Sequence, residues 1–151
     1  MTKNQQYASA VDVGDFPAEV LVPLDDFFRD DRGEIVNVLL TPITSVARIT
    51  SKAGSVRANH YHKTDWHYAI VESGQVLYFE RHIGATDVPE PSVFNPGQMF
   101  FTRPNVEHAM LFSVDSVIYT FAKNVRSHDN HEADLVRVPF VSREIIERYM
   151  P

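Results

Sequence analysis

The 151-residue sequence predicts an all-β protein, a sandwich or barrel of about ten short strands with one short C-terminal helix. Two observations support this fold class. Runs rich in β-branched and aromatic residues recur along the chain, and Gly, Pro, Asn and Asp separate them at near-regular spacing. Only one segment, close to the C terminus, has a pattern typical of a helix.

The first part of the barrel is expected to hold six strands. Residues 45–51 show the clearest alternation, because Ala47 and Ile49 share one face and the residues between them share the other. Residues 66–72 and 75–82 flank Ser73-Gly74 and are expected to pair as a tight hairpin. The six predicted strands are residues 18–24, 34–40, 45–51, 55–62, 66–72 and 75–82, with a turn at 30–33.

The second part is expected to hold four strands and the helix. The helix covers residues 142–149, where Ser142 can cap the N terminus and Arg148 suits the negative end of the helix dipole. The polar stretch 124–132 and the stretch 84–92 are expected to be loops. The four strands are 99–103, 106–113, 116–122 and 133–138, so the predicted division is a flexible arm at 1–14, a barrel at 15–140 and the helix at 141–151.

Composition excludes several classes of function. The formal net charge is −6 and no Lys/Arg cluster is present, which argues against nucleic acid or an anionic membrane as the main partner. The chain has no cysteine, so a thiolate nucleophile and a cysteine-based metal site are excluded. The N terminus lacks the apolar segment of a secretory signal, and no run is long enough to span a bilayer. We expect a soluble, cytoplasmic protein with a small-molecule partner.

Histidines cluster in one short stretch. His60 and His62 are two positions apart on a predicted strand and therefore share a face, and His67 begins the next strand. His108 lies on a separate strand, and tertiary folding must bring it close. A single histidine is usually a surface residue or a hydrogen-bonded core residue, but two imidazoles on one face can also share a metal ion.

The spacing around these histidines resembles the first sequence motif of the cupin superfamily. Gly54, His60, His62, His67 and Gly74 follow the pattern G-x5-H-x-H-x(3,4)-E-x6-G, with a histidine in place of the glutamate. The second cupin motif is echoed by G-Q-M-F-F-T-R-P-N-V-E-H, which ends at His108, although one gap is a residue longer and a glycine is missing. The resemblance covers residues 18–140 and implies a double-stranded β-helix, or jelly roll, with a metal at the mouth of the barrel.

By this resemblance His60, His62 and His108 match the three histidine ligands, and His67 stands at the glutamate position. A neutral imidazole there leaves the cation with its full charge, which makes it a stronger Lewis acid. Alternatively, His67 does not ligate and three histidines hold the ion. One divalent transition metal is expected, and Zn, Fe, Ni, Mn and Cu are not distinguished, because several of these metals accept imidazole.

Two further stretches are similar to enzymes of sugar-nucleotide metabolism. Residues 27–36 resemble a segment of nucleotide-sugar 3,5-epimerases, and V-R-A-N-H-Y-H (56–62) resembles small cupins linked to sugar-nucleotide and capsule biosynthesis, with Ala58 in place of a glycine. Arg32 and Arg57 are therefore candidates for phosphate contact. The alternatives are a plain polar turn for Arg32 and a surface role for Arg57.

The pocket is expected to be lined by residues that share the histidines' faces, namely Ala69, Val71, Met110 and Phe112. Tyr78 or Tyr119 could supply a general acid, but both are better explained as packing residues.

Three functions fit this set of residues. The favoured one is a metal-dependent isomerase, epimerase or cyclase acting on an oxygenated small molecule such as a nucleotide sugar. The alternatives are a dioxygenase that uses non-haem Fe(II), and a non-catalytic sugar- or metal-binding accessory protein. A homodimer is expected, because small cupins commonly pair through their sheets.

Overall fold

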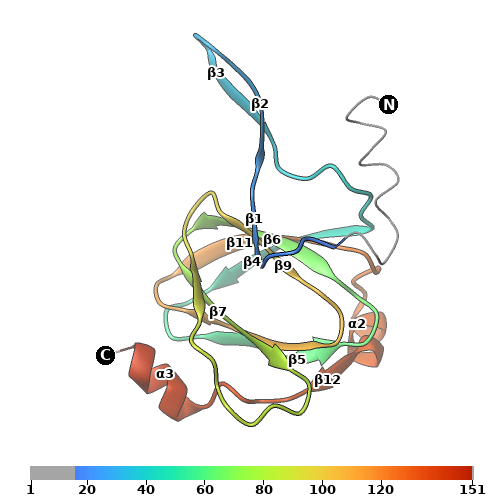
Figure 1. Ribbon diagram of the computed structural model, residues 1–151, viewed down its shortest axis with the longest axis vertical. Helices are drawn as coiled ribbons and strands as arrows, with labels where there is room; N and C mark the ends of the chain where they lie inside the picture. The colour runs from blue at the N-terminus through green and yellow to red at the C-terminus, as the bar shows by residue number, and fades with distance from the viewer. Residues whose placement is uncertain (1–15, 151) are drawn as a thin grey trace.

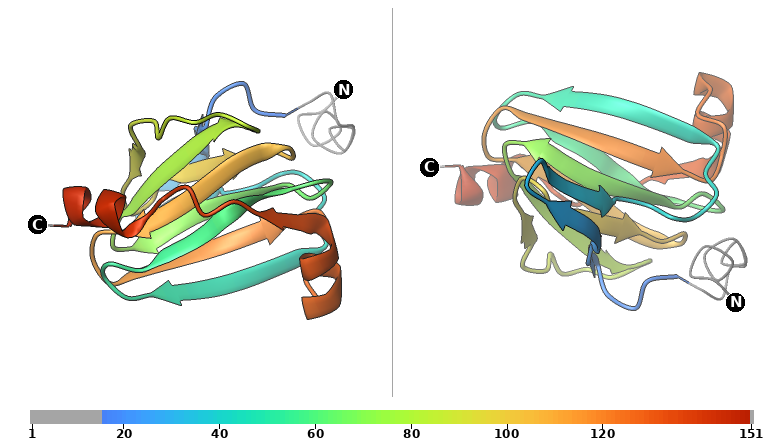
Figure 2. Two further views of the ribbon diagram at one scale, coloured as in Figure 1. Left: turned by 90° about the horizontal axis from the view of Figure 1, so that it is seen from below. Right: turned by 90° about the horizontal axis from the view of Figure 1, so that it is seen from above.

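A computed structural model describes residues 16–150, apart from the side chains of residues 26 and 27. The arm expected over residues 1–14 lies outside the described residues. Two five-stranded antiparallel sheets face each other (Figure 2). The first has the order β1 (Leu21–Val22), β9 (Met99–Thr102), β6 (His67–Ser73), β11 (Ser116–Ala122) and β4 (Ser45–Ser51). The second has the order β12 (Leu135–Arg137), β5 (Val56–His62), β10 (Val106–Phe112), β7 (Val76–His82) and β8 (Ser92–Phe94).

From β4 onwards the chain alternates between the two sheets, except that β7 and β8 both lie in the second. β4, β6, β9 and β11 belong to the first sheet, and β5, β7, β10 and β12 belong to the second. This winding is that of a double-stranded β-helix, so the predicted all-β jelly roll with a short C-terminal helix is confirmed.

The hairpin expected between residues 66–72 and 75–82 is wrong. β6 pairs with β9 and β11 in one sheet, whereas β7 pairs with β8 and β10 in the other. The turn signal itself was correct, because Gly74 has a φ of 88°. A Cβ at Gly74 would lie 2.1 Å from the Oγ of Ser116 and 2.6 Å from the carbonyl oxygen of Asp115, so this glycine lets the chain cross between the sheets beside the end of β11.

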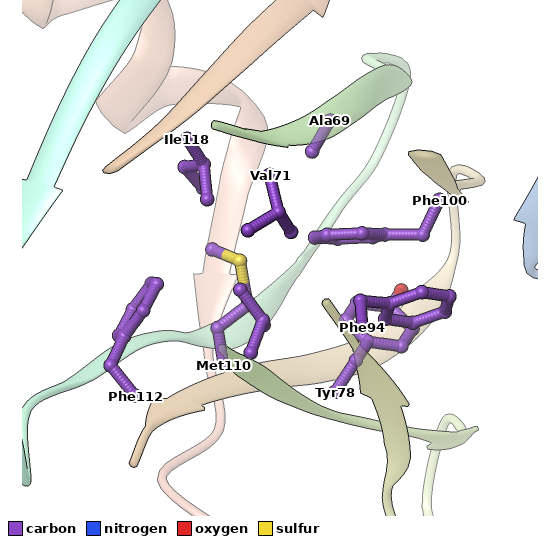
Figure 3. Close-up of a cluster of buried hydrophobic side chains, with 9 residues drawn as sticks. Ala69, Val71, Tyr78, Phe94, Phe100, Met110, Phe112 and Ile118 are labelled. Carbon is purple, nitrogen blue, oxygen red and sulfur yellow. The ribbon is translucent and has the colours of Figure 1, made fainter. Parts of the chain in front are cut away.

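The core lies between the two sheets. Alternate residues of β6, β10 and β11 point inward, and they meet aromatic residues of β7, β8 and β9 in one apolar cluster (Figure 3). The labelled members are Ala69, Val71, Tyr78, Phe94, Phe100, Met110, Phe112 and Ile118. A second cluster covers the outer face of the second sheet, where Val141 and Ile145 of the C-terminal segment pack on Phe79 and Leu111.

A two-stranded ribbon projects from the barrel (Figure 1). It consists of β2 (Asp25–Asp30) and β3 (Gly33–Asn37), joined by the turn predicted at 30–33. The strand expected at 18–24 is reduced to the two residues of β1, and β2 was not predicted because its polar residues carry no alternation.

Two short helices follow the last long strands. The loop expected at 124–132 is wrong, because residues 128–134 form α2 (His128–Asp134), for which Ser127 is the N-cap. The predicted C-terminal helix is α3 (Arg143–Tyr149); Ser142 takes its N-cap position but makes no capping hydrogen bond with its side chain. Neither helix among the described residues has the length and apolar character that crossing a bilayer would require.

Candidate metal centre

Three histidines from two neighbouring strands converge inside the barrel. His60 and His62 lie on β5, His108 lies on β10, and His108 is paired directly opposite His60 in the ladder. The ring centroid of His60 lies 4.7 Å from that of His62 and 4.9 Å from that of His108. One ring nitrogen from each of the three lies within 4.8 Å of the other two. The structure therefore brings together the three side chains that the sequence motifs single out.

A bulge in β5 precedes this site. Ala58 and Asn59 both have positive φ values, 67° and 56°, and the register between β5 and β10 shifts between His108 and Ala109. Non-glycine residues in this region carry strain, which a surrounding structure must compensate. Asn59 supplies that compensation, because its side chain exchanges two hydrogen bonds with the backbone of Val141 (3.0 and 3.1 Å) and its carbonyl accepts the N–H of Val138.

His108 is fully buried and has one free nitrogen. Its Nδ1 lies 3.0 Å from the carbonyl oxygen of Val106, which can only accept, so Nδ1 carries the proton. Its Nε2 has no hydrogen-bond partner among the described residues, and it is the sole buried side-chain N or O atom there without one. A buried acceptor lone pair that faces two other imidazoles is the arrangement expected of a metal ligand.

The environment keeps these imidazoles neutral. Burial lowers the pKa of His108 to about 4. Burial, followed by the proximity of His108 and His62, lowers the pKa of His60 to about 2. Neutral rings present lone pairs at neutral pH, which a cation requires of its histidine ligands.

An outer carboxylate orients His62. Oδ2 of Asp134, the last residue of α2, lies 3.2 Å from Nδ1 of His62, which leaves Nε2 for a ligand. Asp134 is itself fixed by hydrogen bonds from the backbone N–H and hydroxyl of Thr64 and from the backbone N–H of Asp65. Such carboxylate–histidine pairs typically set the tautomer and basicity of metal-binding histidines.

Two more histidines surround the three. His67, on β6 of the opposite sheet, is buried, with its ring 6.0 Å from that of His62 and 5.9 Å from that of His108. It is not among the histidines whose nitrogens lie within 4.8 Å of one another. His131, on α2, lies 5.4 Å from the ring of His62 and was missed from the sequence. The spacing of His128 and His131, one helical turn apart in a polar stretch, was the available signal.

The histidines open into a cavity of about 390 Å³, within the range of small-molecule sites. Among the predicted lining residues, Met110 and Arg57 border it, whereas Ala69, Val71 and Phe112 lie deeper in the core. Tyr78 is also in the core, where its hydroxyl is 3.0 Å from Oγ1 of Thr102.

The structure does not bring the remaining two predicted residues to the cavity. Tyr119 occupies the face of β11 opposite to Thr120, which borders the cavity. Arg32 lies in the turn of the β2–β3 ribbon and pairs with Asp30.

Two residues that the sequence reasoning missed also border the cavity. Asp65 is 8% exposed, and its Oδ1 accepts the backbone N–H groups of Trp66 and Asn124. Burial raises the pKa of Asp65. Arg126 comes from the segment between β11 and α2 and donates from Nη1 to Oγ1 of Thr120 at 3.0 Å.

Comparison with known proteins shows that the fold of this chain is similar to that of several solved structures. No family model matches the sequence, and no curated protein matches it. Among solved structures, a double mutant of the 3,4-ketoisomerase QdtA from Thermoanaerobacterium thermosaccharolyticum, in complex with TDP, is similar over 90% of this chain and 100% of its own, with a TM-score of 0.62 and 22% identity. The dTDP-4-dehydrorhamnose 3,5-epimerase from Sulfolobus tokodaii is similar over 68% of this chain and 69% of its own (TM-score 0.54, 18% identity).

The capsular polysaccharide assembling protein CapF from Staphylococcus aureus is similar over 83% of this chain but only 35% of its own (TM-score 0.55, 20% identity). At these identities the likeness is one of fold. The chain thus shares its jelly-roll fold with these proteins.

Proposed function

We propose that this protein is a metal-dependent isomerase or epimerase of a nucleotide sugar, with His60, His62 and His108 holding one divalent transition ion. The observation that carries the proposal is the fully buried Nε2 of His108, which has no partner among the described residues and faces two neutral imidazoles. Zinc, iron, nickel, manganese and copper remain the candidates, because imidazole nitrogens do not select strongly among several of them.

A bound ion would supply Lewis acidity that polarises a sugar carbonyl. The side chains around the three histidines would handle the proton that such an isomerisation moves between neighbouring carbons. Asp65 is suited to this role, because Oδ1 is held by two backbone N–H groups and no described residue hydrogen-bonds to Oδ2. Its raised pKa, caused by burial, brings the carboxyl closer to the range in which an acid–base catalyst works.

Nucleotide sugars are proposed as substrates because a mutant of the similar ketoisomerase is described in complex with TDP-4-keto-6-deoxyglucose. Arg57 borders the cavity, and in this proposal its guanidinium group would bind a phosphate of the substrate. Tyr78 and Tyr119 have packing roles in this proposal, since one hydroxyl is engaged in the core and the other side chain lies on the outer face.

Metal analysis and isotope exchange test the proposal. The purified protein should contain close to one equivalent of a divalent transition metal, and the His108→Leu variant should contain none. In deuterated buffer, the metal-loaded protein should exchange a carbon-bound proton of TDP-4-keto-6-deoxyglucose or of a related keto sugar nucleotide. A metal-loaded protein that consumes O₂ with such substrates and exchanges no proton would replace this function with that of an oxygenase.

A homodimer is proposed alongside this function. The β2–β3 ribbon exposes Phe28 (48%) and Ile35 (54%), which are paired across the two strands. An isolated two-stranded ribbon is marginally stable in water, so a second copy that covers these residues would stabilise it. A second copy would also cover the apolar groove at the base of the ribbon, which is bordered by Val22, Leu40 and Tyr68. Light scattering should give a dimer mass, and Phe28→Asp with Ile35→Asp should give a monomer.

A further inference from the structure

The cavity that holds the three histidines is also bordered by two cationic side chains, Arg57 and Arg126. Six described arginines form ion pairs with carboxylates, and neither cavity arginine is among them. Arg57 donates to the hydroxyl of Ser51 and to the carbonyl oxygen of Thr50. Arg126 donates to the hydroxyl of Thr120. Hydrogen bonds to neutral oxygens position these guanidinium groups but leave their charges unneutralised.

The net charge of the cavity is opposite in sign to the net charge of the whole protein. The chain has a formal net charge of −6. Among the described residues that border the cavity, Asp65 supplies one carboxylate, Arg57 and Arg126 supply two guanidinium groups, and the imidazoles are neutral, so the cavity carries about one net positive charge without any metal. A divalent ion on the histidines would increase this excess.

The two arginines border the same cavity from different parts of the chain. Arg57 projects from β5, and Arg126 reaches in from the rim to Thr120, which is 2% exposed on β11 of the opposite sheet. Burial lowers the pKa of Arg126 and the neighbouring charge of Arg57 lowers it further, while Asp65 acts in the opposite direction. Each guanidinium keeps N–H groups that the described residues do not use.

We propose that Arg126 and Arg57 together bind one anionic group, a phosphate or a carboxylate, of the molecule that occupies this cavity. The inference rests on the proposed function in that it assigns the anionic group to the substrate of the same site. An anion between two guanidinium groups would relieve their repulsion and form charge-assisted hydrogen bonds in a partly desolvated space. Arg126 is the part of this proposal that goes beyond the sequence resemblance, because no sequence motif points to it.

The test uses the full-length protein after chelator treatment, so that no anion can bind through the metal. Inorganic phosphate and acetate are titrated by calorimetry at constant ionic strength. One or both should bind saturably, and the preferred probe indicates whether the source is a phosphate or a carboxylate. Arg126→Gln and Arg57→Gln should each weaken that binding about tenfold or more, which is the effect of losing a charged hydrogen-bond partner.

Arg48→Gln is the matched control. Arg48 lies on β4 with its side chain outside the barrel, 4.0 Å from a carboxylate oxygen of Glu72, and its replacement should leave anion affinity unchanged. The inference is overturned if neither probe binds saturably, or if either cavity variant binds as tightly as the unmodified protein. Arginine-dependent anion binding in a protein that isomerises no sugar would leave this inference standing and remove the proposed function, while proton exchange without such binding would do the opposite.

Discussion

Replacing His108 with leucine should stabilise the metal-free protein and abolish its response to metal. A buried polar atom without a partner costs about 1–3 kcal/mol, and Nε2 of His108 is such an atom. Leucine has a similar size and removes that cost. It also removes the Nδ1–H bond to Val106, a loss of about 1 kcal/mol, so we expect a net gain of about 1 kcal/mol. For a chain of this size, that gain corresponds to a rise of about 2–4 °C in Tm.

Bound metal should reverse the order of stability of the unmodified protein and the His108→Leu variant. An ion present at 100 times its Kd stabilises the unmodified protein by about 2.7 kcal/mol, whereas the variant has lost a ligand and gains little. Urea denaturation of chelated and metal-saturated samples measures both effects. Tyr78→Phe is the control, because its buried hydroxyl is satisfied by Thr102 and its removal should destabilise the protein under both conditions by about 1 kcal/mol. A chelated His108→Leu protein that is clearly less stable than the unmodified one would show that Nε2 is not an unsatisfied atom.

For four further perturbations, the structure determines the sign of the expected change in stability or metal affinity. Glu107→Ala should cost about 3–5 kcal/mol in urea denaturation, since it leaves Arg81, 12% exposed, without its 2.6 Å partner. Gly74→Ala should cost more than the 1–2 kcal/mol of a left-handed residue alone, because the added Cβ meets Ser116 and the backbone of Asp115, and Tm would report it. Asp134→Asn should weaken metal binding about 10–100-fold in a competition assay with a chelating dye, because the carboxylate that orients His62 is lost. The metal-free protein should be most stable above pH 6.5 and lose stability as the pH falls from there toward 4, because burial holds the pKa of His108 at about 4 in the folded state while the unfolded state takes up protons first.

Matched controls separate these effects from general damage. Glu147→Ala breaks an exposed pair with Arg143 and should cost less than about 1 kcal/mol. Gly84→Ala has a similar φ of 82° but no atom within 4 Å of the added Cβ, so it should show backbone strain alone. Asp129→Asn changes a carboxylate on the same helix as Asp134 and should leave metal affinity unaltered. In the pH experiment, His108→Leu should reduce the loss of stability below pH 6.5, and an unchanged pH profile would contradict the assignment to His108.

The features that could be predicted from the sequence are those that depend on residues close together along the chain. Residues 45–51 and 116–122 alternate between inward and outward side chains as their sequences suggest, and each forms a strand with those bounds. The pairing of strands is not a local property. The turn at Gly74 has the backbone expected of a turn, but the strands on either side do not pair with each other; they pair with strands farther along the chain, as the pairs Val71↔Ile118 and Leu77↔Leu111 show.

The residues of the candidate site also form two groups, one predictable from the sequence and one that only the tertiary structure reveals. His60, His62 and His108 were predictable because their spacing in two motifs is specific. Arg126, in the segment before α2, is in no motif. His131 and Asp134 were not predictable because α2 buries no residue and so carries no hydrophobic periodicity to reveal it. This helix is held by polar contacts instead, chiefly the hydrogen bonds from Thr64 and Asp65 to Asp134, and only tertiary structure shows that they reach the histidines.

The chemistry of the three histidines depends on the apolar core beneath them. The alternation that directs Met110 and Phe112 of β10 into the core also directs His108 inward, two residues before Met110. The same burial that stabilises the fold lowers the histidine pKa values and keeps their lone pairs available. The strained backbone at Ala58 and Asn59 sets the position of His60, and Asn59 is held by the segment that leads to α3. That segment packs on the outer face of the second sheet. Contacts on the outer face of this sheet therefore support the geometry of the histidines on its inner face.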